Sequence, residues 1–144
     1  MTTAAKIGAQ SSAAESKASS ARPSSIVILL RLEGLAVAAI TAVLFARTGA
    51  SWWLFAALWL APDLSMLGYL AGACRGARVY NAFHTYLLPA LLALAALGLR
   101  LHGFMPVALI WANHIGVDRL LGYGLKYGDG FGYTHLGRVG KRRT

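Results

Sequence analysis

The sequence predicts an all-α fold: a bundle of four transmembrane helices with both termini in the cytoplasm. Composition is the first reason, because 57% of the 144 residues are hydrophobic and only 13% are charged. A soluble domain carries about 25% charged residues. The second reason is that the apolar residues form four runs of about 20 residues, the length that a helix needs to cross a hydrocarbon core of about 30 Å. The third is the uneven distribution of basic residues over the loops.

The four apolar runs cover residues 26–46, 52–71, 83–101 and 104–123. Backbone polar groups in lipid must pair within their own segment, so each run is expected to be helical. In the second run Pro62 removes one backbone hydrogen bond, which predicts a kink immediately before Asp63. The spacing of Gly34 and Ala38 in the first run permits a close approach by another helix.

The charges of the loops predict the orientation. With four spans, the N-terminus, the second loop and the C-terminus lie on one side. That side carries ten basic residues: Lys6, Lys17, Arg22, Arg75, Arg78, Lys126, Arg138, Lys141, Arg142 and Arg143. The other side carries only Arg47 and Arg100. Because cytoplasmic loops are rich in Lys and Arg, both termini are expected in the cytoplasm, with the chain in the cell (inner) membrane.

The net charge of +9 is therefore interpreted as topology and attraction to anionic lipid. The expected partner is the lipid bilayer. A nucleic acid is not expected, because the basic residues are scattered over loops and tails and do not form one face. Four helices make a thin bundle, and the sequence leaves open whether a homodimer is needed to seal a cavity.

The chain divides by composition into three parts. Residues 1–25 form a Ser/Ala-rich tail with too little apolar surface to fold, so disorder is predicted. Residues 26–123 form the transmembrane domain. Residues 124–144 form a Gly/aromatic-rich basic tail, whose glycines favour repeated turns at the cytoplasmic surface. In this tail Asp129 and His135 either fold back as a lid or remain solvated.

Five titratable side chains interrupt the apolar runs: Glu33, Asp63, His84, His114 and Asp118. A charged group near the bilayer centre costs at least ~2.5 kcal/mol, and such residues usually face the interior of a bundle. Counted at 1.5 Å per residue from the cytoplasmic ends of the runs, all five lie in the cytoplasmic half. The sequence therefore predicts one polar cavity that opens toward the cytoplasm.

A metal site is one interpretation of this cavity, and it is the alternative to a charge network. His114 and Asp118 are four residues apart and share one helical face. Two histidines and a carboxylate from different helices are ligands that zinc accepts, so His84, His114 and Asp118 are the candidate ligands. Asp63 or Glu33 is then the candidate general base. The sequence contains no HExxH motif, so the indication of zinc comes from the ligand types alone.

An interhelical charge network is the other interpretation, and it is the one that the sequence favours. Arg31 and Arg119 lie in the apolar runs at the same depth as the acids. Pairing of Arg31 with Asp118 or Asp63, and of Arg119 with Glu33, would neutralise the carboxylates without a metal ion.

The two interpretations predict different functions. The charge network predicts a structural, interaction or transport module. The metal site predicts a membrane-embedded hydrolase for a lipid or amphiphile, with Arg31 or Arg119 holding an anionic head group. The sequence leaves open whether the protein is an enzyme.

Several of these residues also carry a resemblance to a known family. The segments are LRLEGL (30–35), the stretch from Trp53 through APDLSMLGY (61–69), YN and HTY (80–86), and HIGVDR through GYGLKY (114–127). They resemble a bacterial integral-membrane family of unknown function, DUF4260, over about residues 29–139. The polar residues fall at the motif positions of the family, whereas residues 129–133 depart from its usual pattern, which affects Asp129 more than His135. The resemblance implies a small multi-pass membrane protein and supplies no established activity.

Overall fold

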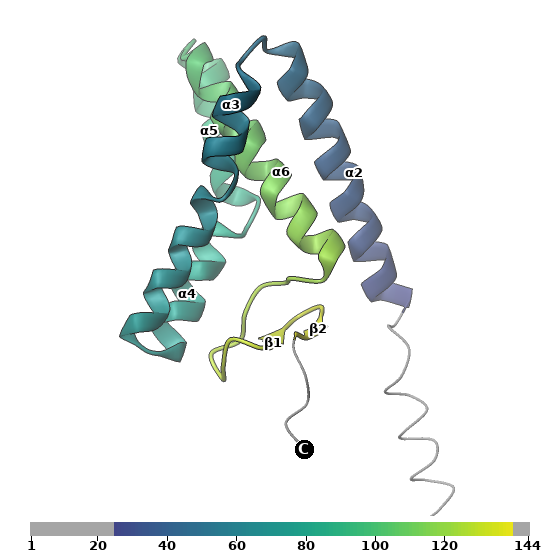
Figure 1. The fold of residues 1–144 in the computed structure, drawn as a ribbon, viewed down its shortest axis with the longest axis vertical. Coiled ribbons are helices and arrows are strands. Elements are labelled where there is room, and N and C mark those ends of the chain that lie inside the picture. Colours follow the sequence, from purple (N-terminus) through teal and green to yellow (C-terminus); the bar gives the residue numbers. More distant parts are fainter. Residues whose placement is uncertain (1–24, 140–144) are drawn as a thin grey trace, which may run out of the picture.

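A computed structural model describes residues 25–139 of the chain. Its helices are α2 (Ser25–Arg47), α3 (Trp52–Trp59), the 3-10 helix η1 (Ala61–Ala71), α4 (Ala73–Phe83), α5 (Leu87–Gly98), the 3-10 helix η2 (His102–Phe104) and α6 (Met105–Leu121) (Figure 1). A short antiparallel hairpin of β1 (Tyr133–Thr134) and β2 (Gly137–Arg138) follows. The disorder predicted for residues 1–25 falls outside the described residues, except for Ser25, which begins α2.

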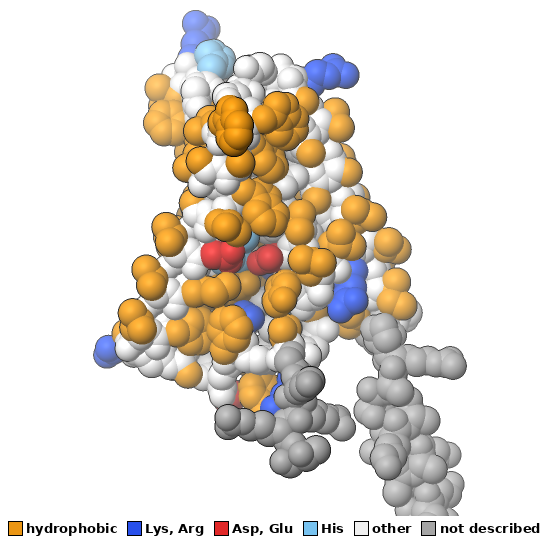
Figure 2. Space-filling model, viewed as in Figure 1, with side chains coloured by type: hydrophobic (Ala, Val, Ile, Leu, Met, Phe, Trp, Pro, Cys, Tyr) orange, Lys and Arg blue, Asp and Glu red, His pale blue; other side chains and the backbone are white. Residues whose placement is uncertain are grey.

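Three helical stretches are long and apolar enough to cross a membrane: Ser25–Arg47, Trp52–Ala71 and Ala73–Gly98. No more than 17% of the apolar window in any of them is buried inside the protein. Large apolar side chains therefore cover the outside, as Figure 2 shows. Leaving such a side chain in water, and not in an apolar environment, costs up to about 1.5–3 kcal/mol. These helices indicate a membrane protein.

Helix α6 lies at the centre of the helices and differs from the predicted fourth span. It has 17 residues, ends at Leu121, and packs against α2, α3 and α5 (Figure 1). The segment from Asn113 to Gly116 is buried throughout. Hydropathy alone does not distinguish such an interior helix from a lipid-facing one, because both are rich in apolar residues.

Helices α2 and α6 cross at a contact between glycines. A Cβ atom added to Gly34 would lie 2.6 Å from the Cβ of Arg119 and 2.7 Å from the carbonyl oxygen of Gly116. One added to Gly116 would lie 2.8 Å from the carbonyl oxygen of Gly34 and 2.9 Å from the amide nitrogen of Ala38. The close approach expected from the spacing of Gly34 and Ala38 is therefore made with α6.

The second apolar run is not one continuous α-helix. Helix α3 ends at Trp59, and Pro62 occupies the first turn of η1, so the helix breaks where the sequence predicted a kink. Proline cannot donate the backbone hydrogen bond that would continue the helix. The eleven residues of η1 are wound as a 3-10 helix, which rarely exceeds three or four residues.

The third helical stretch begins earlier than predicted. Its start was predicted at residue 83, whereas α4 begins at Ala73 and is followed by a break at residues 84–86 before α5. The error arises because Arg75 and Arg78 lower the hydropathy of α4, although its other face, which includes Tyr80, is buried against η1. Gly72, with φ +106°, makes the turn from η1 into α4.

Candidate metal centre

Four side chains from three parts of the fold meet between the helices. Asp63 comes from η1, His84 caps the C-terminus of α4, and His114 and Asp118 come from α6. One potential ligand atom from each of the four lies within 4.8 Å of the others. We call these four residues the His/Asp cluster.

The shortest separations in the cluster all involve the imidazole Nε2 atoms. The Nε2 atoms of His84 and His114 are 3.3 Å apart. His84 Nε2 lies 3.4 Å from Asp63 Oδ1 and 3.6 Å from Asp118 Oδ2. His114 Nε2 lies 3.5 and 3.7 Å from the same two oxygens. The same four atoms therefore surround one point.

His84 is oriented by Tyr80, one helical turn earlier. Its Nδ1 lies 3.0 Å from the carbonyl oxygen of Tyr80. A carbonyl only accepts, so this Nδ1 carries the hydrogen, and Nε2 of a neutral ring is left as an acceptor. The two rings stack with centroids 3.7 Å apart. The Tyr80 hydroxyl also donates to Asp118 Oδ2 at 3.3 Å. Tyr80 thus positions two of the four cluster residues.

His114 and the neighbouring Asn113 are held by α2 and α3. The Asn113 amide donates to the carbonyl oxygen of Ala38 at 2.7 Å and to the hydroxyl of Thr41 at 3.2 Å. Its oxygen accepts from the Trp59 indole at 3.0 Å. The rings of Trp59 and His114 lie edge to face, with their centroids 5.1 Å apart. These contacts fix the rotation of α6 about its axis and therefore the direction of His114.

The cluster is closed on the histidine side and open on the aspartate side. The side chains of His84 and His114 are 3% and 2% exposed, whereas those of Asp118 and Asp63 are 16% and 31% exposed. Figure 2 shows acidic side chains at the surface midway along this face, with imidazole behind them and apolar side chains around them. Asp63 therefore lies at the entrance.

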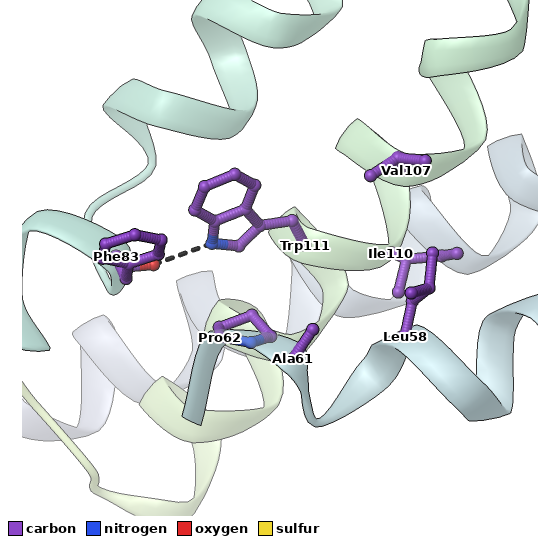
Figure 3. A pocket seen from close by; sticks show the side chains of 7 residues that line it. All are labelled: Leu58, Ala61, Pro62, Phe83, Val107, Ile110 and Trp111. Carbon is purple, nitrogen blue, oxygen red and sulfur yellow. Dashed lines mark hydrogen bonds between the residues drawn. The ribbon is translucent and has the colours of Figure 1, made fainter. Parts of the chain in front are cut away.

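An apolar pocket of about 180 Å³ adjoins the cluster (Figure 3). Its lining is Leu58, Ala61, Pro62, Phe83, Val107, Ile110 and Trp111. The Trp111 indole closes one wall by donating to the carbonyl oxygen of Phe83 at 2.7 Å. Pro62 and Phe83, which line the pocket, immediately precede the cluster residues Asp63 and His84 in the chain. The pocket therefore lies next to the cluster.

The C-terminal segment folds back against α4. Asn81 donates to the carbonyl oxygen of Lys126 at 2.8 Å and accepts from its amide at 2.7 Å. The Lys126 side chain is buried, and its Nζ lies 4.0 Å from the ring centroid of Phe131 and 5.1 Å from that of Tyr80. This burial lowers the pKa of Lys126. Neither Lys126 nor Tyr80 was predicted as a site residue; the signal available for Tyr80 was its position four residues before His84.

The other predicted site residues lie outside the cluster. Glu33 is exposed on α2. Arg119 donates to the carbonyl oxygen of His84 at 3.2 Å and meets His135 Nε2 at 2.8 Å. Burial, and then the charge of Arg119, lower the pKa of His135. His135 contacts this arginine and the Leu125 amide, and Asp129 is exposed.

The predicted arginine–carboxylate pairs are not formed. Within residues 25–139 every ion pair shorter than 4.0 Å joins a histidine to Asp63 or Asp118. Arg31 packs beside Gly122 instead. Arg119 contacts the carbonyl oxygen of His84 and the ring of His135, and not Glu33. The structure does contain a buried polar network between helices, but imidazoles and carboxylates form it, and not arginines and carboxylates.

Comparison with known proteins gives one match. A family model described as a domain of unknown function (DUF4260) matches residues 27–139. No curated protein matches the chain, and no solved structure matches it. The matched range contains all four residues of the His/Asp cluster.

Proposed function

The chain belongs to the DUF4260 family, and we propose that it is a multi-pass membrane protein that binds a divalent metal ion of the zinc class in the His/Asp cluster. The observation that carries this proposal is the spacing of the ligand atoms. In a tetrahedral site with bonds of about 2.0–2.2 Å, neighbouring ligand atoms lie about 3.3–3.6 Å apart. Five of the six separations in the cluster fall between 3.3 and 3.7 Å.

The charges of the cluster support the same proposal. The lone pair on Nε2 of a neutral His84 faces the oxygens of Asp63 and Asp118, which are also acceptors. A cation at the centre turns these repulsive contacts into attractive ones. A divalent ion also balances two carboxylates, and buried charges are stable only when paired or coordinated. The hydrogen bond from His84 Nδ1 to a backbone carbonyl is typical of a metal-binding histidine.

The proposed topology has four passes, with the shorter α6 as the fourth, and both termini in the cytoplasm. In Figure 1 the start of α2, the turn between η1 and α4, and the C-terminal hairpin lie toward one end. The α2–α3 and α5–α6 connections lie toward the other end. The excess of basic residues supports a cytoplasmic position for the first end, and thus insertion in the cell (inner) membrane.

Hydrolysis of a lipid or amphiphile is the reaction class that this site suits. Catalytic zinc sites use three protein ligands and keep a fourth position open, and the bound ion lowers the pKa of water there. The buried His84 and His114 and the less exposed aspartate, Asp118, would be these three ligands, and the more exposed Asp63 would stand beside the fourth, open position. Asp63, at the entrance, is placed to accept a proton. The adjoining apolar pocket would hold part of an alkyl chain.

Elemental analysis of protein purified without chelators tests the metal centre. We expect about one ion per chain in the wild type and a loss in both His114→Ala and Asp118→Asn, because each removes a ligand. His102→Ala is the matched control, since His102 is exposed in η2, at the connection of α5 to α6, and is not a member of the cluster. Wild-type protein free of metal in every preparation would contradict the proposal.

If no metal is found, the second candidate function is a structural, interaction or transport module held together by a charge network. It predicts that Asp118→Asn lowers the thermal stability in detergent while no sample contains metal, because the buried imidazoles of His84 and His114 would lose one carboxylate partner. Asp63→Asn separates binding from catalysis in the metal version. We expect this variant to keep its ion and to lose hydrolysis of a test amphiphile by about 10²-fold or more. Equal turnover in wild type and variant would exclude Asp63 as the base.

A further inference from the structure

A second polar site lies beside the C-terminal end of α6, and none of the His/Asp cluster lines it. It is a pocket of about 550 Å³ between α2, the start of α5, the end of α6 and the C-terminal segment. Its polar lining is Glu33, Tyr86, Arg119 and His135. We propose that this pocket binds the head group of an amine-bearing phospholipid, with the phosphate at Arg119 and the ammonium group at Glu33.

Two opposite charges line the pocket without neutralising each other. In the part of the chain that the structure describes, neither Glu33 nor Arg119 has an ion-pair partner within 4.0 Å. Glu33 lies in a stretch long and apolar enough to cross a membrane. A lone carboxylate there is costly. A zwitterionic ligand that places a cation at Glu33 and an anion at Arg119 would satisfy both.

The anion would be received by hydrogen-bond donors that are already positioned. The guanidinium of Arg119 is held between the carbonyl oxygen of His84 and the ring of His135. It has five N–H donors, so these contacts leave others for a phosphate. The Tyr86 hydroxyl is buried and has no hydrogen-bond partner among the described residues. A phosphate oxygen in the pocket would satisfy it.

The surroundings of the pocket favour a lipid over a soluble phosphate ester. Leu30 and Val37 form part of the wall. Ile40 and Leu44 follow Glu33 by seven and eleven residues, so they continue the same face of α2. Their side chains are 59% and 47% exposed. This apolar stripe leads from the charged end of the pocket along α2, where an acyl chain would lie.

The carboxylate selects the kind of head group. A primary ammonium donates charge-assisted hydrogen bonds to Glu33. A trimethylated amine has no N–H to donate, and a glycerol head group has no positive charge. The predicted order of affinity is therefore phosphatidylethanolamine above phosphatidylcholine and phosphatidylglycerol.

Native mass spectrometry of the full chain in detergent, with these three lipids carrying identical acyl chains, tests the proposal. We expect wild type to retain phosphatidylethanolamine at least about tenfold more tightly than either of the others. Glu33→Gln should reduce this preference to within about twofold. Tyr86→Phe should weaken all three lipids. Asp129→Asn is the matched control, because Asp129 is exposed and lies outside the pocket.

Three results of these measurements would contradict the proposed binding of an amine-bearing phospholipid. Equal retention of the three lipids by wild type, or an unchanged preference in Glu33→Gln, would remove its basis. Displacement of the lipid by an equal concentration of free phosphoethanolamine would assign the pocket to a soluble ligand. The metal content of each variant is measured in parallel. Wild-type metal content in Glu33→Gln shows that a loss of lipid preference does not come from damage to the His/Asp cluster.

Discussion

Tyr80 illustrates how one side chain supports a whole site. Its carbonyl oxygen orients His84, its ring stacks on the same imidazole, and its hydroxyl contacts Asp118. Partners of this kind often change metal affinity by 10–100-fold although they do not touch the ion. The phenol is also nearly fully buried, so its contribution includes packing.

Tyr80→Phe should weaken metal binding without unfolding the protein. The substitution removes only the hydroxyl that donates to Asp118, while the stacking and the backbone contact remain. We expect the zinc dissociation constant, measured by chelator competition, to rise by about tenfold. Tyr127→Phe serves as the control because Tyr127 is exposed. An unchanged constant in Tyr80→Phe would mean that its hydroxyl has no role in the site.

The sequence predicted only part of the composition of the cluster. The four-residue spacing of His114 and Asp118 placed both on one face of a helix, and the structure brings them together. Glu33 and Asp63 had similar depths, so hydropathy could not separate them. Which one faces inward depends on the rotation of each helix, and packing sets that rotation. Asp63 faces the histidines, whereas Glu33 faces the second pocket.

The contact of α2 with α6 depends on the absence of side chains at two positions. Gly34 and Gly116 let the backbones approach so closely that each Cβ would meet backbone atoms of the opposite helix. Backbone cannot move aside as a flexible side chain can. The hydrogen bonds of Asn113 to α2 require the same close approach. A change at this contact should therefore also affect the neighbouring His114.

Gly34→Ala should lower the free energy of unfolding by about 1–3 kcal/mol, because overpacking forces the backbones apart. It should also reduce metal occupancy. Gly98→Ala is the matched control, since a Cβ there would meet no atom within 4 Å. This control should be neutral or slightly stabilising, because alanine favours helix more than glycine does. Thermal denaturation in detergent measures both, and equal melting temperatures would contradict the assigned contact.

Helix boundaries were predicted best where apolar residues continue to the ends. The first run was predicted at 26–46, and α2 covers Ser25–Arg47. Prediction failed at α4, where arginines on one face mask a buried face. It also failed to predict the 3-10 winding of η1, because helix type follows from packing that a single sequence does not reveal. The break at Pro62 was predictable, since proline imposes it locally.

The arrangement of the helices places Cys74 in a useful position for testing the orientation. This cysteine is the only one in the chain and is exposed in the first turn of α4, beside the turn from η1. The proposed topology puts that turn at the cytoplasmic surface. A native thiol can therefore report the orientation without any change to the sequence.

A membrane-impermeant maleimide should label Cys74 in inside-out vesicles and leave it unlabelled in right-side-out vesicles. The reason is that the reagent reaches only the outward-facing surface of a sealed vesicle. Cys74→Ser with His102→Cys provides the control, because His102 lies at the opposite ends of the helices and should give the reverse pattern. Labelling of Cys74 from the outside of intact cells would invert the topology.

The order of the cluster along the chain has a consequence for biosynthesis. Asp118 is 55 positions after Asp63, so at about 5–20 residues per second the ribosome adds the last of the four residues roughly 3–11 seconds after the first. Throughout that interval Asp63 lacks the two partners that α6 supplies, the imidazole of His114 and the carboxylate of Asp118. The four groups can assemble only after α6 has been made and has packed against α2 and α3. Completion of this cluster therefore depends on α6, and a chain truncated before α6 would retain Asp63 and His84 without the partners that α6 supplies.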